Sequence, residues 1–441
     1  MNLEDFRQHA HQLVDWMADY LQNIEQLPVK SQVAPRTIYQ ALPAAAPEQG
    51  EDFSRIWVDL QQIIMPGITH WQHPGFFAYF PANSSPPSVL AEMLTATLGA
   101  QCMLWETSPA AAELEEKVMD WLKNALQLPE SWSGVIQDTA STGTLCALLT
   151  ARERFAAYQI NHQGLQNAPQ FCVYTSTQAH SSIDKAVKIA GLGTERLRKI
   201  AVDEAFALQP QALRQAIEVD LQAGLQPLCV VATVGTTSTT AIDPLPEIGA
   251  ICQEFGLFLH VDAAYAGTVA LLPEKRHLFA GIEQADSFLF NPHKWMLTNF
   301  DCTAYFVKDK SALIQTFEIL PEYLKTAHDS QVNNYRDWGI QLGRRFRSLK
   351  LWFVLRSYGL EGIRQYLRQH LELASVFADK IQQAADFELM APVSLNLVCF
   401  RWKPAFIASS TEAVNRANEQ LLKALNNTGK VYLTHTKLGD A

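Results

Sequence analysis

A lysine and an aspartate each follow a short apolar run in the middle of this chain. Lys294 lies in Asn291-Pro-His-Lys-Trp295, directly after residues 286–290, which are predicted to form a buried strand. Lysines are seldom buried without a chemical reason, and a desolvated ammonium loses its proton readily. A neutral amine in a cleft can attack a carbonyl and form a Schiff base. The alternative is a partly exposed lysine at a strand end that has no chemical role.

The second apolar run, residues 257–262, ends in the carboxylate of Asp262. Small residues follow it up to Gly267, and they would let a flat molecule approach the backbone. Asp262 alone is equally well explained as a helix cap or a turn residue. Pyridoxal phosphate, however, needs a lysine for its aldehyde and an anionic partner for its ring nitrogen. Lys294 and Asp262 together therefore indicate a pyridoxal phosphate site.

Size and composition limit the classes of protein to which the chain can belong. Its 441 residues predict two or three domains, and 48% hydrophobic with 18% charged residues is ordinary for a globular protein. A net charge of −10 argues against nucleic-acid binding, and no apolar stretch approaches the roughly 18 residues that span a membrane. The amino terminus lacks a signal-peptide pattern, and the seven cysteines are scattered without metal-ligand spacing. We therefore expect a cytoplasmic protein without a metal site.

The pattern of apolar residues divides the chain into three parts. Helical spacing predicts two amphipathic helices, over about residues 3–25 and 53–64, in an N-terminal helical dimerisation segment, residues 1–85. Apolar runs alternate with helical segments over residues 86–350, which predicts a large α/β domain with a mostly parallel sheet. Its site is expected at the carboxyl ends of the strands. Residues 351–441 mix helix with strands and predict a small α+β domain.

Several segments resemble a known enzyme family. Those that resemble the group II pyridoxal-phosphate amino-acid decarboxylases are residues 178–182, 261–265 and 290–295. Those that resemble its aromatic L-amino acid decarboxylases are residues 70–71, 76–81 and 343–350. The resemblance runs from Asp5 to Cys399 and implies the aspartate aminotransferase-like type I fold of these enzymes. It also implies a homodimer with its active site at the subunit interface, and a C-terminal domain shorter than in relatives.

The resemblance assigns the residues around the cofactor ring. It implies that Lys294 holds the cofactor, that Asp262 pairs with the ring nitrogen, and that His180 stacks over the ring. Ala264 leaves room on the opposite face, and Thr237 lies near the cofactor hydroxyl and the substrate carboxylate. Lys294, Asp262, His180 and Tyr335, discussed below, are the predicted catalytic residues. A lone histidine at the position of His180 is otherwise more often a cap or a core residue.

The resemblance also assigns the phosphate site. It implies that Thr139, Ala140 and Ser141 bind the phosphate, joined by Asn291 and His293. This agrees with the sequence, because hydroxyls and backbone amides before the helical run 145–154 favour an anion at a helix amino terminus. Helix capping alone would also explain such a cluster of serines and threonines.

The polar residues 325–337 are predicted to form a loop, and a solvated loop without function is the simpler interpretation. The resemblance implies a lid whose tyrosine, matched to Tyr335, returns a proton during the reaction. Related aldehyde synthases carry phenylalanine at that position.

Aromatic residues and one glycine are the predicted substrate determinants. Trp71, Tyr79, Phe80 and Pro81 form a wall suited to a flat side chain, although each could pack in a core. The resemblance adds Gly343, because relatives that act on histidine or small phenols often have serine there.

We therefore predict decarboxylation of an aromatic L-amino acid (tryptophan, hydroxytryptophan, dopa, phenylalanine or tyrosine) to the arylalkylamine and carbon dioxide. The alternatives are an aromatic aldehyde synthase or a histidine decarboxylase of the same family, and a non-catalytic scaffold that binds pyridoxal phosphate.

Overall fold

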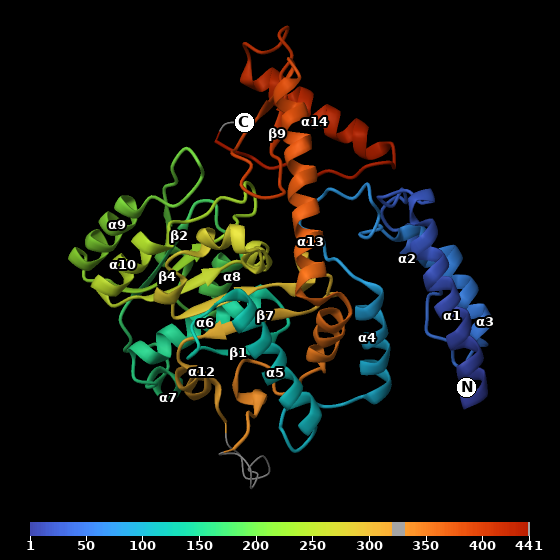
Figure 1. Ribbon diagram of the computed structural model, residues 1–441, viewed down its shortest axis with the longest axis horizontal. Coiled ribbons are helices and arrows are strands. Elements are labelled where there is room, and N and C mark those ends of the chain that lie inside the picture. The colour runs from blue at the N-terminus through green and yellow to red at the C-terminus, as the bar shows by residue number, and fades with distance from the viewer. Residues whose placement is uncertain (320–330, 440–441) are drawn as a thin grey trace. The chain divides into compact units, whose positions relative to one another are not determined.

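The computed structural model describes residues 1–319 and 331–439. The chain divides into two compact units, one formed by Met1–Pro81 with Trp402–Ala441 and the other by Ala82–Arg401 (Figure 1). The larger unit begins within three residues of the predicted boundary at residue 85, but it continues well past residue 350. The predicted division into three domains stays a prediction.

The larger unit is built on a seven-stranded sheet with the order β1-β7-β6-β5-β4-β2-β3. The strands are β1 (Ser133–Gln137), β2 (Phe171–Ser176), β3 (Leu197–Ile200), β4 (Gln226–Thr233), β5 (Phe258–Asp262), β6 (Ser287–Phe290) and β7 (Thr303–Val307). Only β7 runs antiparallel to its neighbours. Every residue of β2, β5, β6 and β7 is buried, because helices cover both faces of the sheet, and this explains the continuous apolar runs in the sequence.

Helices pack on both faces of this sheet. The α-helices described in the larger unit are α4 (Pro86–Leu98), α5 (Pro109–Leu126), α6 (Ala140–Phe155), α7 (Ile160–Gln163), α8 (Ser182–Ile189), α9 (Pro210–Gln222), α10 (Leu245–Phe255), α11 (Pro292–Trp295), α12 (Lys310–Phe317) and α13 (Arg347–Gln383). On one face, Val173 and Val231 belong to a core cluster with residues of α6 and α8. On the other face, the Tyr174 hydroxyl donates to Asp220 of α9 at 2.8 Å. Figure 1 shows α9 and α10 side by side.

Two features of the larger unit lie after the sheet. The long helix α13 is broken at Gly359, whose φ of 62° and ψ of 171° are not helical. A glycine is suited to this position because it adopts positive φ without steric strain. The short strands β8 (Phe387–Leu389) and β9 (Phe400–Trp402) then pair as a separate two-stranded sheet. These two strands lie within residues 351–441, and the small α+β domain predicted there stays a prediction.

The smaller unit is mainly helical, with α1 (Leu3–Asn23), α2 (Thr37–Ala41), α3 (Phe53–Asp59) and α14 (Thr411–Asn427). The predicted N-terminal helices are α1 and α3, and aromatic pairs join them, among them Trp16 and Trp57 at 5.4 Å. The second predicted helix changes to π-helical geometry over Leu60–Ile64. Near the end of the chain, Tyr432 pairs with Phe76 in an isolated β-bridge. No helix of the described residues is long and apolar enough to cross a lipid bilayer.

Candidate active site

The parallel strands bring together residues that are far apart in the sequence. Asp262 is the last residue of β5, and its register partners are Thr233 at the end of β4 and Leu289 near the end of β6. Asn291 and Lys294 follow β6, His180 follows β2, and Thr139 follows β1. Because these strands run in the same direction, their carboxyl ends lie at one edge of the sheet. The predicted cofactor residues of the larger unit all belong to this edge, here called the carboxyl edge.

The Asp262 carboxylate lies close enough to influence the protonation of both Lys294 and His180. Burial lowers the pKa of Lys294, and the Asp262 carboxylate opposes this effect by favouring the charged amine. Burial also lowers the pKa of His180, with Asp262 raising it and Lys294 lowering it further. Because its pKa is lowered, a larger fraction of Lys294 carries a neutral amine than in a solvated lysine at the same pH. This is the protonation state that attack on an aldehyde requires.

Local hydrogen bonds orient the carboxylate and the imidazole. Asp262, only 4% exposed, accepts the backbone N–H of Ala264 through Oδ1 at 2.9 Å. Nδ1 of His180 accepts the backbone N–H of Ser182 at 3.1 Å and lies 2.9 Å from its hydroxyl. Since a backbone N–H can only donate, the neutral imidazole carries its proton on Nε2. The side chain of His180 is exposed, so a ring could lie against it.

The corner between β6 and α11 is fixed by buried side chains. Asn291 accepts the Thr303 hydroxyl through Oδ1 at 2.8 Å, and its backbone N–H donates to Ala264 O at 3.0 Å. His293 accepts the backbone N–H of Cys302 through Nδ1 at 3.0 Å. Burial lowers the pKa of His293 to about 4, so this imidazole is neutral at physiological pH. These contacts explain why both residues are buried, and their predicted role as phosphate ligands stays a prediction.

The predicted phosphate residues form the start of α6. Thr139 is the N-cap of this helix, and its hydroxyl accepts the backbone N–H of Thr142 at 3.4 Å. Ala140 and Ser141 occupy the first turn, where helix N–H groups have no partner within the helix. Ser141 is exposed, so its hydroxyl is accessible to a ligand. The 16-residue helix therefore presents amides and a hydroxyl to an anion at the carboxyl edge.

Thr237 lies at the exposed tip of a tight turn that follows β4. The backbone N–H groups of Gly235 and Thr236 both donate to Ala241 O, at 3.0 and 3.1 Å. Gly235 has a φ of 88°, and a Cβ there would lie 2.6 Å from the Cβ of Ala266, so only glycine fits. Asp243 accepts the backbone N–H of Thr233 at 2.7 Å, and burial raises its pKa to about 6. The turn is thus held rigidly enough to present the Thr237 hydroxyl in a fixed place.

His260 is a residue of this region that the sequence analysis did not identify. It is fully buried in β5, with Nδ1 2.8 Å from the Ser287 hydroxyl of β6 and Nε2 3.4 Å from the Thr144 hydroxyl of α6. One imidazole therefore connects the strand that carries Asp262, the strand that leads to Lys294, and the helix of the predicted phosphate site. Its position two residues before Asp262, on the same apolar strand, was the available signal.

Tyr335 begins a short 3-10 helix, Tyr335–Asp337, and is buried, so the simpler interpretation of a solvated loop does not apply to this residue. It is 2% exposed, within the core, with its ring 5.2 Å from that of Trp338 and 4.9 Å from the guanidinium of Arg344. Its hydroxyl is buried and has no hydrogen-bond partner among the residues that the structure describes. Burial, reinforced by Glu115, raises its pKa well above the ordinary value. The remainder of the predicted lid, residues 325–330, lies outside the described residues.

The predicted substrate residues fall in both compact units. In the smaller unit the ring of Trp71 lies 6.0 Å from that of Tyr79, and both side chains are exposed, followed by half-buried Phe80 and Pro81. Gly343 belongs to the larger unit, where it lines a cavity of about 410 Å³. A Cβ on Gly343 would lie 3.2 Å from Nε2 of Gln101, so even a small side chain would crowd this amide.

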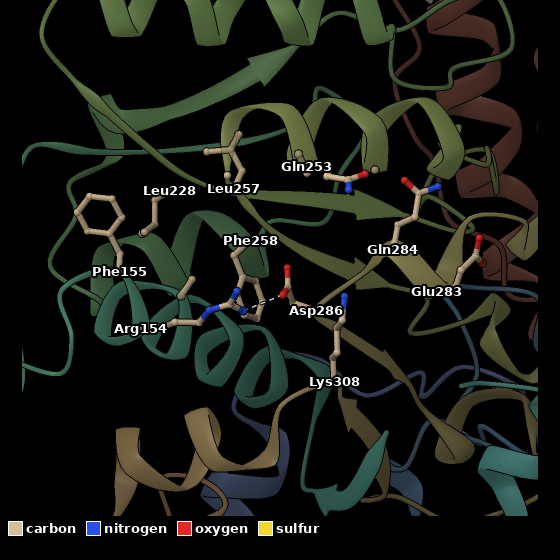
Figure 2. A pocket seen from close by; sticks show the side chains of 14 residues that line it. Arg154, Phe155, Leu228, Gln253, Leu257, Phe258, Glu283, Gln284, Asp286 and Lys308 are labelled. Carbon is tan, nitrogen blue, oxygen red and sulfur yellow. Dashed lines mark hydrogen bonds and ion pairs between the residues drawn. The ribbon is translucent and has the colours of Figure 1, made fainter. Parts of the chain in front are cut away.

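A larger cavity, of about 480 Å³, lies at the opposite edge of the sheet, beside Phe258 and Asp286 where β5 and β6 begin. Figure 2 shows its ion pair between Arg154 and Asp286, 2.8 Å apart, with Lys308 among the lining residues. None of the predicted site residues lines this cavity, so it is separate from the candidate active site.

Comparisons with known proteins agree with this geometry. A family model described as the pyridoxal-dependent decarboxylase conserved domain matches residues 35–403. The aromatic-L-amino-acid decarboxylase of Bos taurus is 46% identical over 454 residues, covering 100% of this chain and 91% of the bovine protein. The phenylacetaldehyde synthase of Arabidopsis thaliana is 44% identical over 449 residues, covering 99% of this chain and 90% of that protein.

The solved structure of Catharanthus roseus tryptophan decarboxylase in complex with L-tryptophan is 41% identical, with a TM-score of 0.93. The alignment covers 100% of this chain and 93% of that one. The predicted resemblance, the type I fold and the pyridoxal cofactor are thereby confirmed. The roles of individual site residues stay predictions.

The buried histidines predict how stability depends on pH. Burial lowers the pKa of His260 to about 4, so between about pH 6.5 and pH 4 the unfolded chain binds a proton that the folded chain does not. Stability therefore falls as the pH is lowered, by about 1.4 kcal/mol per pH unit for this imidazole. We expect His260→Asn to be less stable at neutral pH but to lose stability less steeply on acidification, in urea unfolding followed by tryptophan fluorescence.

The exposed His162 provides the control. His162→Asn is expected to keep the acid dependence of the wild-type protein. An acid dependence of His260→Asn as steep as that of the wild type would contradict the assignment of this proton to His260.

Proposed function

Because the chain belongs to the family of pyridoxal-dependent decarboxylases, we propose that it converts an aromatic L-amino acid to the arylalkylamine and carbon dioxide. The observation that carries this proposal is the desolvated Lys294 at the carboxyl edge, with the Asp262 carboxylate near enough to raise the pKa of both Lys294 and His180 against the effect of burial. The names of relatives at 44–46% identity support an aromatic substrate. The reaction class is that of a carboxy-lyase.

The residues of the carboxyl edge fit pyridoxal phosphate. When bound, this cofactor withdraws electrons from the bond to the substrate carboxylate. In this proposal Lys294 holds the cofactor, the oriented Asp262 carboxylate pairs with the ring nitrogen, and His180 lies against the ring. Thr139, Ala140 and Ser141 bind the phosphate with the first-turn amides of α6, and Asn291 and His293 complete that site. Thr237 orients the substrate carboxylate, and Ala264 leaves the second face of the ring free.

The substrate pocket requires a flat side chain in this proposal. In the smaller unit, Trp71, Tyr79, Phe80 and Pro81 are the proposed aromatic and apolar determinants. In the larger unit, Gly343 is a further proposed determinant, because a Cβ at this position would lie 3.2 Å from Nε2 of Gln101. Phenylacetaldehyde synthases are also similar to this chain, so oxidation of the same substrate to an aldehyde is the second candidate. Histidine decarboxylation and a non-catalytic scaffold are separated from the main proposal by the same experiment.

We also propose that the active molecule is a homodimer. Leu90, Leu94 and Leu98 recur every fourth residue on α4, and their side chains are 52%, 46% and 62% exposed. Such a row of exposed leucines is costly in water and is typical of a surface that another protein covers. A second copy of the chain is the occupant proposed here, with the active site at the subunit interface.

A cytoplasmic location is supported by the cysteines. All seven are free of disulfides, and six of them are buried, as expected of a chain that folds in a reducing compartment.

The function is tested by a turnover panel of tryptophan, phenylalanine, tyrosine, dopa and histidine, with products identified. We expect one amine and one carbon dioxide per aromatic substrate consumed, without aldehyde or peroxide. Lys294→Ala should lose the visible absorbance of the bound cofactor and at least about a thousandfold in turnover, because the amine that holds the aldehyde is gone. Lys188→Ala, at an exposed lysine of α8, is the matched control and should resemble the wild type.

Aldehyde and peroxide as products would favour the synthase, and amine formed only from histidine would favour a histidine decarboxylase. Cofactor absorbance that survives unchanged in Lys294→Ala, with no turnover of any substrate, would support the non-catalytic scaffold.

The proton donor is tested by two tyrosine variants. The sequence has another tyrosine, Tyr323, two residues before the predicted loop 325–337 and outside the described residues. In this proposal Tyr335 returns the proton. Because its hydroxyl is buried without a partner among the described residues, we expect Tyr335→Phe to keep its stability but to switch its product from amine to aldehyde. Tyr323→Phe is the companion variant. We expect Tyr323→Phe to keep the amine product, and an unchanged amine product from Tyr335→Phe would contradict the role of Tyr335 as the donor.

The dimer is tested by charge substitution on α4. Leu94→Glu places a carboxylate in the row of leucines, and we expect the mass measured by light scattering to fall to that of a monomer, because burying an unpaired charge is costly. Val219→Glu, at a 62% exposed position on α9, is the control and should not change the mass. A wild-type protein that is already monomeric while turning over substrate would refute the proposal.

A further inference from the structure

A short segment at the start of the larger unit, residues 83–88, holds the turn that carries Lys294. The backbone N–H of Asn83 donates to His293 O at 3.1 Å, and its side-chain Nδ2 donates to Lys294 O at 2.6 Å. Further along, the Ser85 hydroxyl donates to Leu297 O at 2.7 Å. Asn83 thus supplies both donors to the two carbonyls nearest the side chain of Lys294.

The helix that contains Lys294 cannot hold its own conformation. α11 has only four residues, and a helix this short leaves its last carbonyls without partners and is unstable in isolation. Immediately after it, Leu297 has a φ of 53°, in the left-handed region that costs energy for a branched side chain. The conformation of this turn must therefore be imposed by contacts from elsewhere in the fold, and Asn83 provides two of them.

These two hydrogen bonds constrain the root of the lysine side chain. His293 O belongs to the peptide plane before Lys294, and Lys294 O belongs to the plane after it. Because peptide units are planar, fixing both planes fixes φ and ψ of Lys294 and hence the direction of its Cα–Cβ bond. Rotation about the remaining side-chain bonds can then place the Lys294 amine only in the region in front of the carboxyl edge.

We propose that Asn83 is a positioning residue for Lys294, which directs its amine toward the aldehyde of the cofactor by fixing the adjacent peptide planes. This inference rests on the proposed role of Lys294. Asn83 is 8% exposed, and its Oδ1 has no hydrogen-bond partner among the residues that the structure describes. The interaction that this side chain makes is therefore the hydrogen bond donated by Nδ2 to Lys294 O, and not one accepted by Oδ1.

The donor requirement distinguishes positioning from ordinary packing. Asn83→Asp keeps the size of the side chain but replaces the donating nitrogen with an oxygen that faces Lys294 O. When ionised, this carboxylate repels the carbonyl, and when protonated it can donate in place of the amide. Asn83→Ala removes the side-chain bond and keeps the backbone bond to His293 O. If Asn83 served packing alone, the difference in cofactor affinity and kcat between Asn83→Asp and Asn83→Ala would not depend on pH.

Asn418 offers a matched control in the smaller unit. Its Nδ2 donates to Trp402 O at 2.7 Å and its Oδ1 accepts Trp402 N–H at 2.8 Å, so it is also an asparagine that holds backbone groups. Asn418→Ala should lower the thermal midpoint as Asn83→Ala does. It should leave cofactor affinity and kcat unchanged, because the backbone that it holds does not carry a site residue.

The experiment titrates the apo forms of all variants with pyridoxal phosphate, follows the absorbance, and then measures kcat and KM. For Asn83→Ala we expect cofactor affinity and kcat each to fall about tenfold with KM nearly unchanged, as for a misdirected reactive group. At about pH 8, Asn83→Asp should lose more cofactor affinity and kcat than Asn83→Ala does. At about pH 6 its affinity and kcat should rise toward those of Asn83→Ala, because burial beside a carbonyl raises the pKa of the new carboxyl group and allows it to be protonated.

Wild-type affinity and kcat in both Asn83 variants would overturn the inference, as would equal losses in both at every pH. A wild-type protein that binds no pyridoxal phosphate would instead overturn the proposed function, so the two failures are distinguishable.

Discussion

The desolvation of the Lys294 amine is the constraint on which the rest of the site depends. A charged ammonium is stabilised by water, so an amine kept neutral must be removed from water and held away from excess negative charge. The Asp262 carboxylate opposes the lowering of the Lys294 pKa, and this carboxylate is oriented by the Ala264 N–H. The parallel sheet provides both conditions, because the carboxyl ends of adjacent strands lie in register at a buried edge.

Holding the elements of this edge in place requires buried polar groups that have no direct contact with a ligand. His260 connects β5, β6 and α6, Asp243 connects Thr233 to Leu208, and Asn83 holds the turn after β6. Each of these side chains is within the protein, so each bond is stronger than in water and costly to lose. The precision of the site therefore depends on residues well outside the reacting groups.

Much of the fold and of the site was predictable from local patterns. Strands β5 and β6 are continuous apolar runs, and Asp262 and Lys294 stand out at their ends because polar residues interrupt the pattern. His260 and Asn83 could not be identified in the same way, because their roles depend on hydrogen bonds across 116 and 211 residues of sequence. The burial of Tyr335 could not be predicted, because its polar neighbours suggest a solvated loop, whereas its ring packs against Trp338 and Arg344.

The buried cysteines have a consequence for the chemistry of the site. Aldehydes react with thiolates as well as with amines, so an enzyme that holds an aldehyde cofactor risks capture by its own cysteines. Burial raises the pKa of all seven thiols. The pKa rises to about 11 for Cys102 and to about 12 for Cys302, whose backbone N–H donates to His293. Because the thiolate is the reactive form, these residues remain inert at physiological pH. In the proposed role of Lys294, its amine would therefore react with the aldehyde without competition from the thiols of its own chain.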